Sequence, residues 1–273
     1  MSDQIYPPSA EFVANAKINK SDYDNMYAES INNVDNFWGE HGKRVDWIKP
    51  YSKIKDVDYS YPNVSIKWFE DGQLNVSANC IDRHLENRGD QTAIIWEGDN
   101  PDDSKHISYS ELHRQVCKLS NVYKKLGVKK GDRVVLYIPM IPEAAYAMLA
   151  CARIGAIHSI VFAGFSPEAL ASRIEDCGAS LLVTADEAPR GGKITPLKTN
   201  VDKALNICGD IKTLVVERTN GDVPMKNDRD YSYSALMADA SEDYTPEAMN
   251  AEDPLFILYL SLIHISEPTR RTS

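Results

Sequence analysis

The chain has 273 residues, of which 43% are hydrophobic, and a formal net charge of -10 at pH 7. Nucleic-acid-binding surfaces need a basic face, and no extended run of Lys and Arg is present, so we expect no nucleic-acid partner. No apolar run approaches the roughly 18 to 20 residues of a membrane span, and the first ten residues lack a signal-peptide pattern, so we expect a soluble cytoplasmic protein without a membrane partner.

The cysteines indicate neither a disulfide framework nor a zinc site. They are odd in number, scattered, and include no Cys-x-x-Cys pair. We expect buried free thiols in a reducing compartment. The five are Cys80, Cys117, Cys151, Cys177 and Cys208.

Residues 1–85 are polar and rich in aromatic side chains that follow no regular period. This pattern predicts an irregular N-terminal segment that wraps over a larger body. Its last part, Asn75 to Leu85, is predicted to form one helix with Val76 and Cys80 facing inward. Asp82, at the polar side of this helix, is interpreted as part of a solvated or salt-bridged face, because no nucleophile accompanies it.

A hairpin and a long amphipathic helix are predicted next. Two short β-branched runs, Thr92–Trp96 and His106–Tyr109, flank a turn-rich segment. Ser108 and Glu111 match a capping box, and apolar residues then recur at helical spacing until Gly127.

The stretch from Gly131 to Asp186 predicts a β-α-β-α-β unit. Its strands are expected at Arg133–Tyr137, His158–Val161 and Ser180–Thr184, as short apolar runs without alternation. The first helix is expected over Glu143–Ile154, between a first-turn proline and a C-terminal glycine. In the second helix, Ser166 is the predicted N-cap and Gly178 the end.

Further elements continue the alternation of helix and strand. Helices are predicted from about Thr195 to Ile207 and over Tyr233–Ala240, and strands over Thr213–Val216 and Leu255–Tyr259. The sequence therefore predicts an α/β fold with a doubly wound parallel sheet. Ligands of such sheets bind outside the carboxyl ends of the strands, so the loops at Phe162 and Asp186 are the expected place for chemistry.

Two loops in this region are candidate ligand contacts. Arg190, Gly191, Gly192 and Lys193 place two cations around two glycines whose amides are free to approach a phosphate. The alternative is an ordinary basic surface turn. Phe162 and Gly164 belong to a Phe-Ala-Gly-Phe turn that could lay a ring beside a flat ligand, or simply anchor a tight turn in the core.

No complete catalytic signature is present. The sequence lacks Gly-x-x-x-x-Gly-Lys-Ser/Thr, Gly-x-Ser-x-Gly, His-Glu-x-x-His and Gly-x-Gly-x-x-Gly. The residues alone predict an α/β module that could bind a phosphorylated ligand.

Longer segments carry a resemblance to a known family. They are KWFEDGQLNVSANCIDRHL, GDRVVLYIPMIPEAAYAMLACARIGAIHSIVFAGFSPEALASRI and MNAEDPLFILY. Together they resemble the N-terminal part of the AMP-forming acetyl-coenzyme A synthetases, which are acetate-CoA ligases of the adenylate-forming superfamily. The resemblance implies that residues 86–259 form part of an AMP-binding domain and that acetate, ATP and coenzyme A are substrates, with magnesium on the phosphates.

The resemblance also assigns the candidate loops. Arg190 to Lys193 correspond to the family's loop for the 3′-phosphoadenosine end of coenzyme A, with Phe162 and Gly164 beside the adenine. The family more usually has Arg where Lys193 stands, so a bidentate contact is replaced by a point charge.

The segment 260–273 departs from the family, where a Thr/Ser/Gly-rich ATP phosphate loop begins at this point. It resembles the translation of a transposon-end adapter used in sequencing libraries, which predicts an artefactual tail; the alternative is a natural variant C-terminus. The implied acetate, ATP and magnesium sites lie beyond it, so no catalytic or metal residue is assigned. We therefore expect a catalytically incomplete fragment of an acetate-CoA ligase, or alternatively a stand-alone CoA- or nucleotide-binding module. A non-enzymatic interaction protein has no positive feature in its favour.

Overall fold

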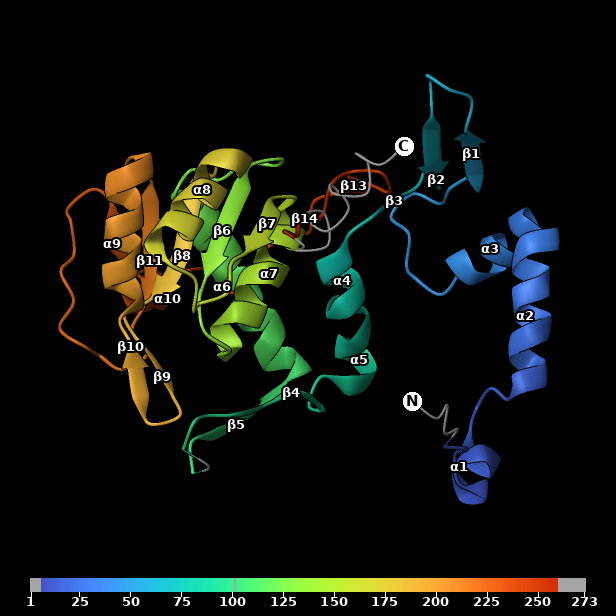
Figure 1. Cartoon of the computed structure of the whole chain (residues 1–273), viewed down its shortest axis with the longest axis horizontal. Helices are drawn as coiled ribbons and strands as arrows, with labels where there is room; N and C mark the ends of the chain where they lie inside the picture. Colours follow the sequence, from blue (N-terminus) through green and yellow to red (C-terminus); the bar gives the residue numbers. More distant parts are fainter. Residues whose placement is uncertain (1–5, 101, 260–273) are drawn as a thin grey trace, which may run out of the picture. The chain divides into compact units, whose positions relative to one another are not determined.

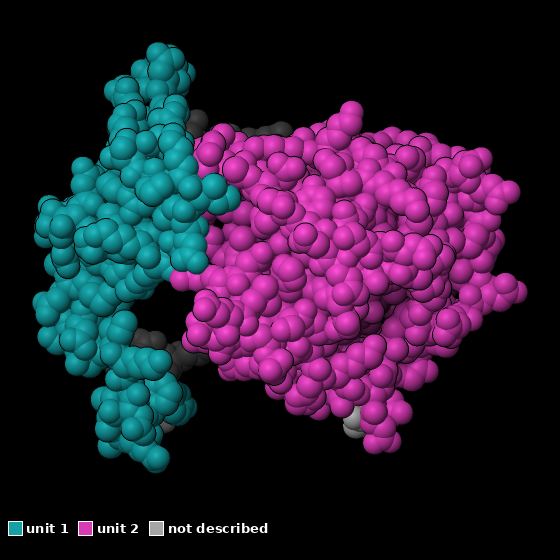
Figure 2. Space-filling model, turned by 180° about the vertical axis from the view of Figure 1, so that it is seen from behind, with its two compact units in different colours: residues 1–72 teal, residues 73–273 magenta. Residues whose placement is uncertain are grey.

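The computed structural model in Figure 1 describes residues 6–100 and 102–259. The chain divides into two compact units, residues 1–72 and 73–273, which Figure 2 distinguishes by colour. The predicted tail at 260–273 lies outside the described residues. Among the residues described, no helix combines the length and apolarity that crossing a membrane would need.

The first unit is held by contacts among its aromatic side chains. The ring of Tyr51 lies 4.9 Å from that of Trp47 and 4.6 Å from that of Phe69, between centroids. Such tilted and edge-on contacts add to the burial of aromatic surface. Its elements are α1 (Ala10–Asn15), α2 (Lys20–Asn32), α3 (Val34–Gly42), β1 (Lys55–Asp58) and β2 (Ser65–Trp68), the last two forming an antiparallel pair.

The second unit contains the predicted α/β body. Its helices are α4 (Val76–Cys80), the 3-10 turn η1 (Asp82–His84), α5 (Leu85–Arg88), α6 (Tyr109–Lys125), α7 (Pro142–Ile154), α8 (Pro167–Cys177), α9 (Leu197–Cys208) and α10 (Tyr233–Ala238). Its strands are β3 (Gln73–Leu74), β4 (Thr92–Glu97), β5 (Ser104–Ser108), β6 (Arg133–Tyr137), β7 (Ile157–Ile160), β8 (Leu181–Ala185), β9 (Ala188–Arg190), β10 (Lys193–Thr195), β11 (Lys212–Val216), β12 (Asp230–Ser232), β13 (Met249–Asn250) and β14 (Phe256–Ile257).

Six strands form one parallel sheet in the order β12-β11-β8-β6-β7-β14, which confirms the predicted fold class. The chain passes from β6 to β7 on one side and then to β8 on the other side of β6. Right-handed crossovers then place α7 and α8 on opposite faces, and α6 packs against α7 while α8 packs against α9 (Figure 1). The central strands β6 and β8 are covered on both faces, as their unbroken apolar runs predicted.

The helix boundaries in this sheet follow the predicted signals. Gly155 ends α7 with φ of 72° and Gly178 ends α8 with φ of 59°, both in the left-handed region where glycine is unstrained. The hydroxyl of Ser166 accepts a hydrogen bond from the amide of Ala169 at 3.3 Å, as an N-cap does.

One predicted helix was wrong. Asn75 to Leu85 is divided among α4, η1 and α5, so that Ile81 is fully buried and Cys80 is exposed. The Asn75 side chain fixes this geometry, because its amide donates to the carbonyls of Ala152 at 3.0 Å and Glu247 at 2.9 Å while its oxygen caps α4. The expectation of buried thiols therefore fails at Cys80 and holds fully only at Cys117 and Cys151, because Cys177 and Cys208 are half-buried. All five cysteines are free.

The salt-bridged interpretation of Asp82 is confirmed. Its carboxylate accepts two hydrogen bonds from the guanidinium of Arg153, at 2.8 and 2.9 Å, and the Arg153 side chain is 2% exposed. Burial alone would raise the pKa of Asp82, but hydrogen bonds from His113 and Arg153 hold it well below its usual range. This pair joins η1 to the C-terminal end of α7.

Candidate functional site

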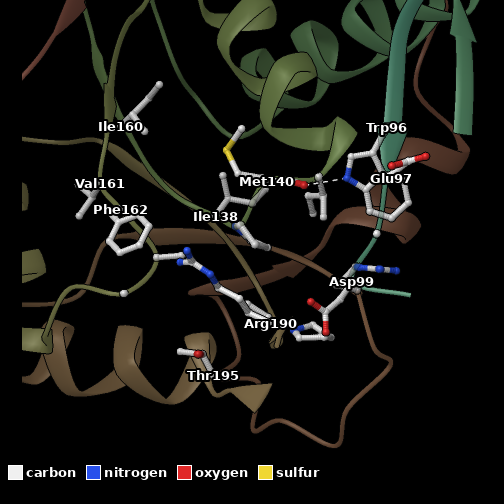
Figure 3. Close-up of a pocket in the computed structure, with 18 residues that line it drawn as sticks. Trp96, Glu97, Asp99, Ile138, Met140, Ile160, Val161, Phe162, Arg190 and Thr195 are labelled. Atoms are coloured by element: carbon white, nitrogen blue, oxygen red, sulfur yellow. Dashed lines mark hydrogen bonds between the residues drawn. The ribbon is translucent and has the colours of Figure 1, made fainter. Parts of the chain in front are cut away.

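A cavity of about 460 Å³ lies beyond the carboxyl ends of β6, β7 and β8 (Figure 3). Three of the segments that line it, residues 138–141, 160–164 and 188–190, follow or end those strands. A fourth, residues 96–99, comes from the end of β4. Because the strand order reverses around β6, the cavity occupies the position where doubly wound sheets bind ligands.

The cavity has an apolar wall, and a hydrogen bond between β4 and the loop after β6 forms its frame. The indole N–H of Trp96 donates to the carbonyl of Met140 at 2.7 Å and so ties β4 to the loop after β6 (Figure 3). The side chains of Met140 and Phe162 are 89% and 55% exposed. Apolar surface of this kind, open to solvent at the mouth of a cavity, can receive a flat ligand.

Gly164 is required by the position of the Phe162 ring. A Cβ atom at residue 164 would lie 2.5 Å from Cε1 of Phe162, which is too close for any side chain. The ring can therefore fold over its own turn only because residue 164 is glycine.

The predicted basic loop is a β-hairpin. Arg190 at the end of β9 and Lys193 at the start of β10 are directly opposite, and Gly191 and Gly192 between them have φ of 58° and 70°. Two-residue hairpin turns of this type need positive φ at both positions. Because residues paired across antiparallel strands point to the same face, the hairpin directs both cations to one side.

The two candidate turns lie at the same rim of the sheet, as the sequence predicted. The guanidinium carbon of Arg190 is 5.7 Å from the centroid of the Phe162 ring, and both residues line the cavity (Figure 3). This distance permits a cation–π contact. Within the described part of the chain, no carboxylate lies within ion-pair distance of Arg190 or Lys193, so their charges face the solvent uncompensated at that range.

The amides of the glycine turn are not free, contrary to the expectation from the sequence. The Asp99 carboxylate accepts hydrogen bonds from the N–H groups of Gly191 and Gly192, at 2.8 and 3.2 Å. These two bonds lower the pKa of Asp99. Asp99 lies in the turn-rich segment after β4, and only its turn composition marked that segment in the sequence.

Arg218 is a second residue that the sequence did not reveal. Its guanidinium carbon is 5.0 Å from the centroid of Trp96, and it donates to the Asp103 carboxylate at 2.6 Å. A lone arginine after a buried strand gives no signal of such a contact in the sequence.

Asp186, where chemistry was expected, organises the neighbouring loop instead. Its carboxylate is 1% exposed and accepts backbone N–H groups from Arg218 at 2.9 Å and Gly221 at 3.1 Å. A buried carboxylate with several amide donors is satisfied within the fold. Its role is to hold the loop that carries Arg218.

Comparison with known proteins identifies the family. Residues 81–261 match the model of the AMP-binding enzymes, and residues 23–80 match that of the acetyl-coenzyme A synthetase N-terminus. The chain belongs to the family of AMP-binding enzymes.

The chain is similar in sequence to acetyl-coenzyme A synthetases. That of Methylocella silvestris is 57% identical over 96% of this chain and 41% of its own length. That of Parvibaculum lavamentivorans is 58% identical over 96% of this chain and 40% of its own length. The chain therefore spans about 40% of the length of these curated relatives.

A solved structure shows the same fold. The acetoacetyl-CoA synthetase from Streptomyces lividans superposes with a TM-score of 0.80 at 24% identity, covering 92% of this chain and 40% of that chain. At this identity the likeness supports the fold of the AMP-binding enzyme, not its substrate.

The described residues contain no cluster of metal-ligating side chains. Across 6–100 and 102–259, no three His, Cys, Asp or Glu side chains gather closely enough to hold a metal ion.

Proposed function

We propose that this chain is the N-terminal part of an acetate-CoA ligase. In the proposed reaction, the acetate carboxylate attacks the α-phosphate of ATP to give acetyl-AMP and pyrophosphate. The thiol of coenzyme A then attacks the acyl carbon and releases AMP. The relatives' names and the family match support this proposal.

Within this reaction, we propose that the cavity binds the 3′-phosphoadenosine end of coenzyme A. The observation that carries this proposal is the pair of cations, Arg190 and Lys193, on one face of the hairpin. The guanidinium carbon of Arg190 lies 5.7 Å from the centroid of the exposed Phe162 ring. The 3′-phosphate would contact Arg190 and Lys193, and the adenine would lie against Phe162 at the Gly164 turn. Arginine supplies a planar, two-pronged donor and lysine a point charge, and both suit a phosphate dianion.

The proposed partners are therefore the small molecules acetate, ATP and coenzyme A. The proposed location is the cytoplasm, where the free cysteines would stay reduced.

Calorimetric titration with coenzyme A and with 3′-dephospho-coenzyme A tests the assignment of the cavity. The two ligands differ only in the phosphate that the hairpin would hold. Since a hydrogen bond to a charged group contributes roughly 1.5–3 kcal/mol, coenzyme A should bind at least about tenfold more tightly. Equal affinities for the two ligands would contradict the proposal that the hairpin binds the 3′-phosphate.

A further inference from the structure

The β9–β10 hairpin has little support of its own. Each of its strands has three residues, and Ile194 in β10 is 60% exposed. An isolated two-stranded hairpin is marginally stable in water, so its orientation depends on contacts from outside.

Asp99 provides such a contact at the tip of the hairpin. Its two carboxylate oxygens bind separate amides, Oδ1 that of Gly191 at 2.8 Å and Oδ2 that of Gly192 at 3.2 Å. Two bonds from one planar group fix the direction of the turn as well as its position. The cations flank these two glycines directly, so a fixed turn also fixes the points from which Arg190 and Lys193 leave the backbone.

The segment that carries Asp99 is itself anchored. The amide of Gly98 donates to the carbonyl of Asp103 at 2.6 Å, and the Asp103 carboxylate accepts from Arg218. Two residues before Gly98, Trp96 is bonded to the loop after β6. Asp99 therefore connects the hairpin to the frame of the cavity.

Asp99 has two possible relations to a ligand phosphate. It could occupy the turn amides until a phosphate displaces it, or it could stay bound and hold the turn while the cations receive the phosphate. Within the described residues, no ion pair joins Asp99 to Arg190 or Lys193, so both cations are available to a phosphate while Asp99 stays on the turn amides. The second relation is therefore favoured. The amides and the cations thus serve separate partners.

We propose that Asp99 is a positioning residue that sets the selectivity of the cavity for a 3′-phosphorylated ligand. It holds the glycine turn so that Arg190 and Lys193 meet the phosphate together. This inference rests on the proposed function of the cavity.

The test compares Asp99→Ala and Asp99→Asn with Asp102→Ala, a control that removes an exposed carboxylate from the same segment but outside the cavity lining. Each variant is titrated with coenzyme A and with 3′-dephospho-coenzyme A. Asp99→Ala should lower the affinity ratio of the two ligands by at least about fivefold, since misplaced cations lose charge-assisted bonds to the phosphate. Asp99→Asn, which keeps one acceptor oxygen, should lower the ratio less, and Asp102→Ala should leave it unchanged.

Amide hydrogen exchange without ligand gives a second readout. Exchange at Gly191 and Gly192 should accelerate in Asp99→Ala and stay at the wild-type rate in Asp102→Ala. An unchanged ratio, tighter binding of coenzyme A, or unchanged exchange in Asp99→Ala would overturn the inference. If the wild-type chain itself binds both ligands equally, the proposed function fails first, which is a different result.

Discussion

At the scale of single residues, the two cations of the hairpin should contribute differently. Arg190 lies against the Phe162 ring, whereas Lys193 has no aromatic contact among the described residues. Lys193→Ala should weaken the binding of coenzyme A about tenfold and leave the binding of 3′-dephospho-coenzyme A unchanged. Arg190→Ala should weaken the binding of both ligands, because it also loosens the Phe162 ring, against which the adenine is proposed to lie.

Calorimetry on the two variants and on Lys124→Ala, an exposed lysine of α6, checks this prediction. Lys124→Ala should bind both ligands as the wild-type chain does. Identical losses for Arg190→Ala and Lys193→Ala with both ligands would contradict the division of roles.

His158 should make the chain sensitive to mild acid. It lies in β7, stacks on Phe256 with 5.7 Å between ring centroids, and its buried Nδ1 has no hydrogen-bond partner in the described structure. Burial lowers the pKa of His158 from 6.5 to about 4. Because the folded pKa is below the unfolded one, the unfolded chain binds more protons between these values. The contribution of His158 to the free energy of unfolding is therefore fully present above about pH 6.5 and is lost as the pH falls toward 4.

Urea unfolding of the wild type and of His158→Gln at pH 7 and pH 5 measures this effect. The wild type should lose up to about 2 kcal/mol more than the variant between the two pH values. Parallel losses in the two proteins would show that His158 is not the group responsible.

At the scale of elements, the β9–β10 turn should tolerate asparagine and reject a β-branched residue. Both glycines have positive φ, and Asn-Gly is a favoured pair in such turns. Gly191→Asn should therefore keep the selectivity for coenzyme A, whereas Gly192→Val should abolish most of it because valine cannot adopt this conformation without strain. Titration with the two ligands decides, and full selectivity in Gly192→Val would argue that the hairpin geometry is irrelevant.

The contact between η1 and α7 should be important for folding. Removing one partner of a buried ion pair leaves an unpaired buried charge, so Asp82→Ala should lower the free energy of unfolding by about 3 kcal/mol. Glu242→Ala removes the partner of Lys118 in a surface pair with 3.9 Å between charged atoms and should cost less than about 1 kcal/mol. Denaturant unfolding measures both, and equal losses would mean that the Arg153 site is not effectively buried.

The sequence predicted the sheet well because local signals and buried strands agree there. Apolar runs marked β6, β7 and β8, and a proline, a serine cap and two glycines marked the ends of α7 and α8. The β9–β10 hairpin was missed although two adjacent glycines signal such a turn. Asp99 is 92 residues from Gly191, and no local pattern reveals a contact at that separation. The prediction that Cys80 faces inward was wrong because the Asn75 side chain sets the start of α4 by bonding to backbone carbonyls far along the chain.

At the scale of the whole molecule, the edge of the sheet at β14 should promote self-association. Within the described residues, β14 pairs only with β7, and Phe256 and Leu258 are 54% and 57% exposed. An open apolar edge can pair with another copy. Leu258→Lys should reduce light scattering at concentrations where the wild type associates, and Ile95→Lys, at an even more exposed site elsewhere, should not. A monodisperse wild type would contradict this prediction.

The chain should not form acetyl-AMP by itself. It spans about 40% of the length of its relatives, and no catalytic residue is assigned in it. Acetate-dependent exchange of pyrophosphate into ATP should stay at background for the purified 273-residue chain. Exchange above background would require an adenylation site within these residues.

The central claim is that one rim of the sheet brings a basic hairpin and an aromatic turn to the same ligand. A crystal structure of the chain with coenzyme A tests it most directly. The 3′-phosphate should lie within about 3 Å of nitrogen atoms of Arg190 and Lys193, with the adenine against Phe162 and Asp99 still bonded to the turn. A 3′-phosphate bound away from the hairpin, with the cations of residues 190 and 193 in solvent, would contradict the account.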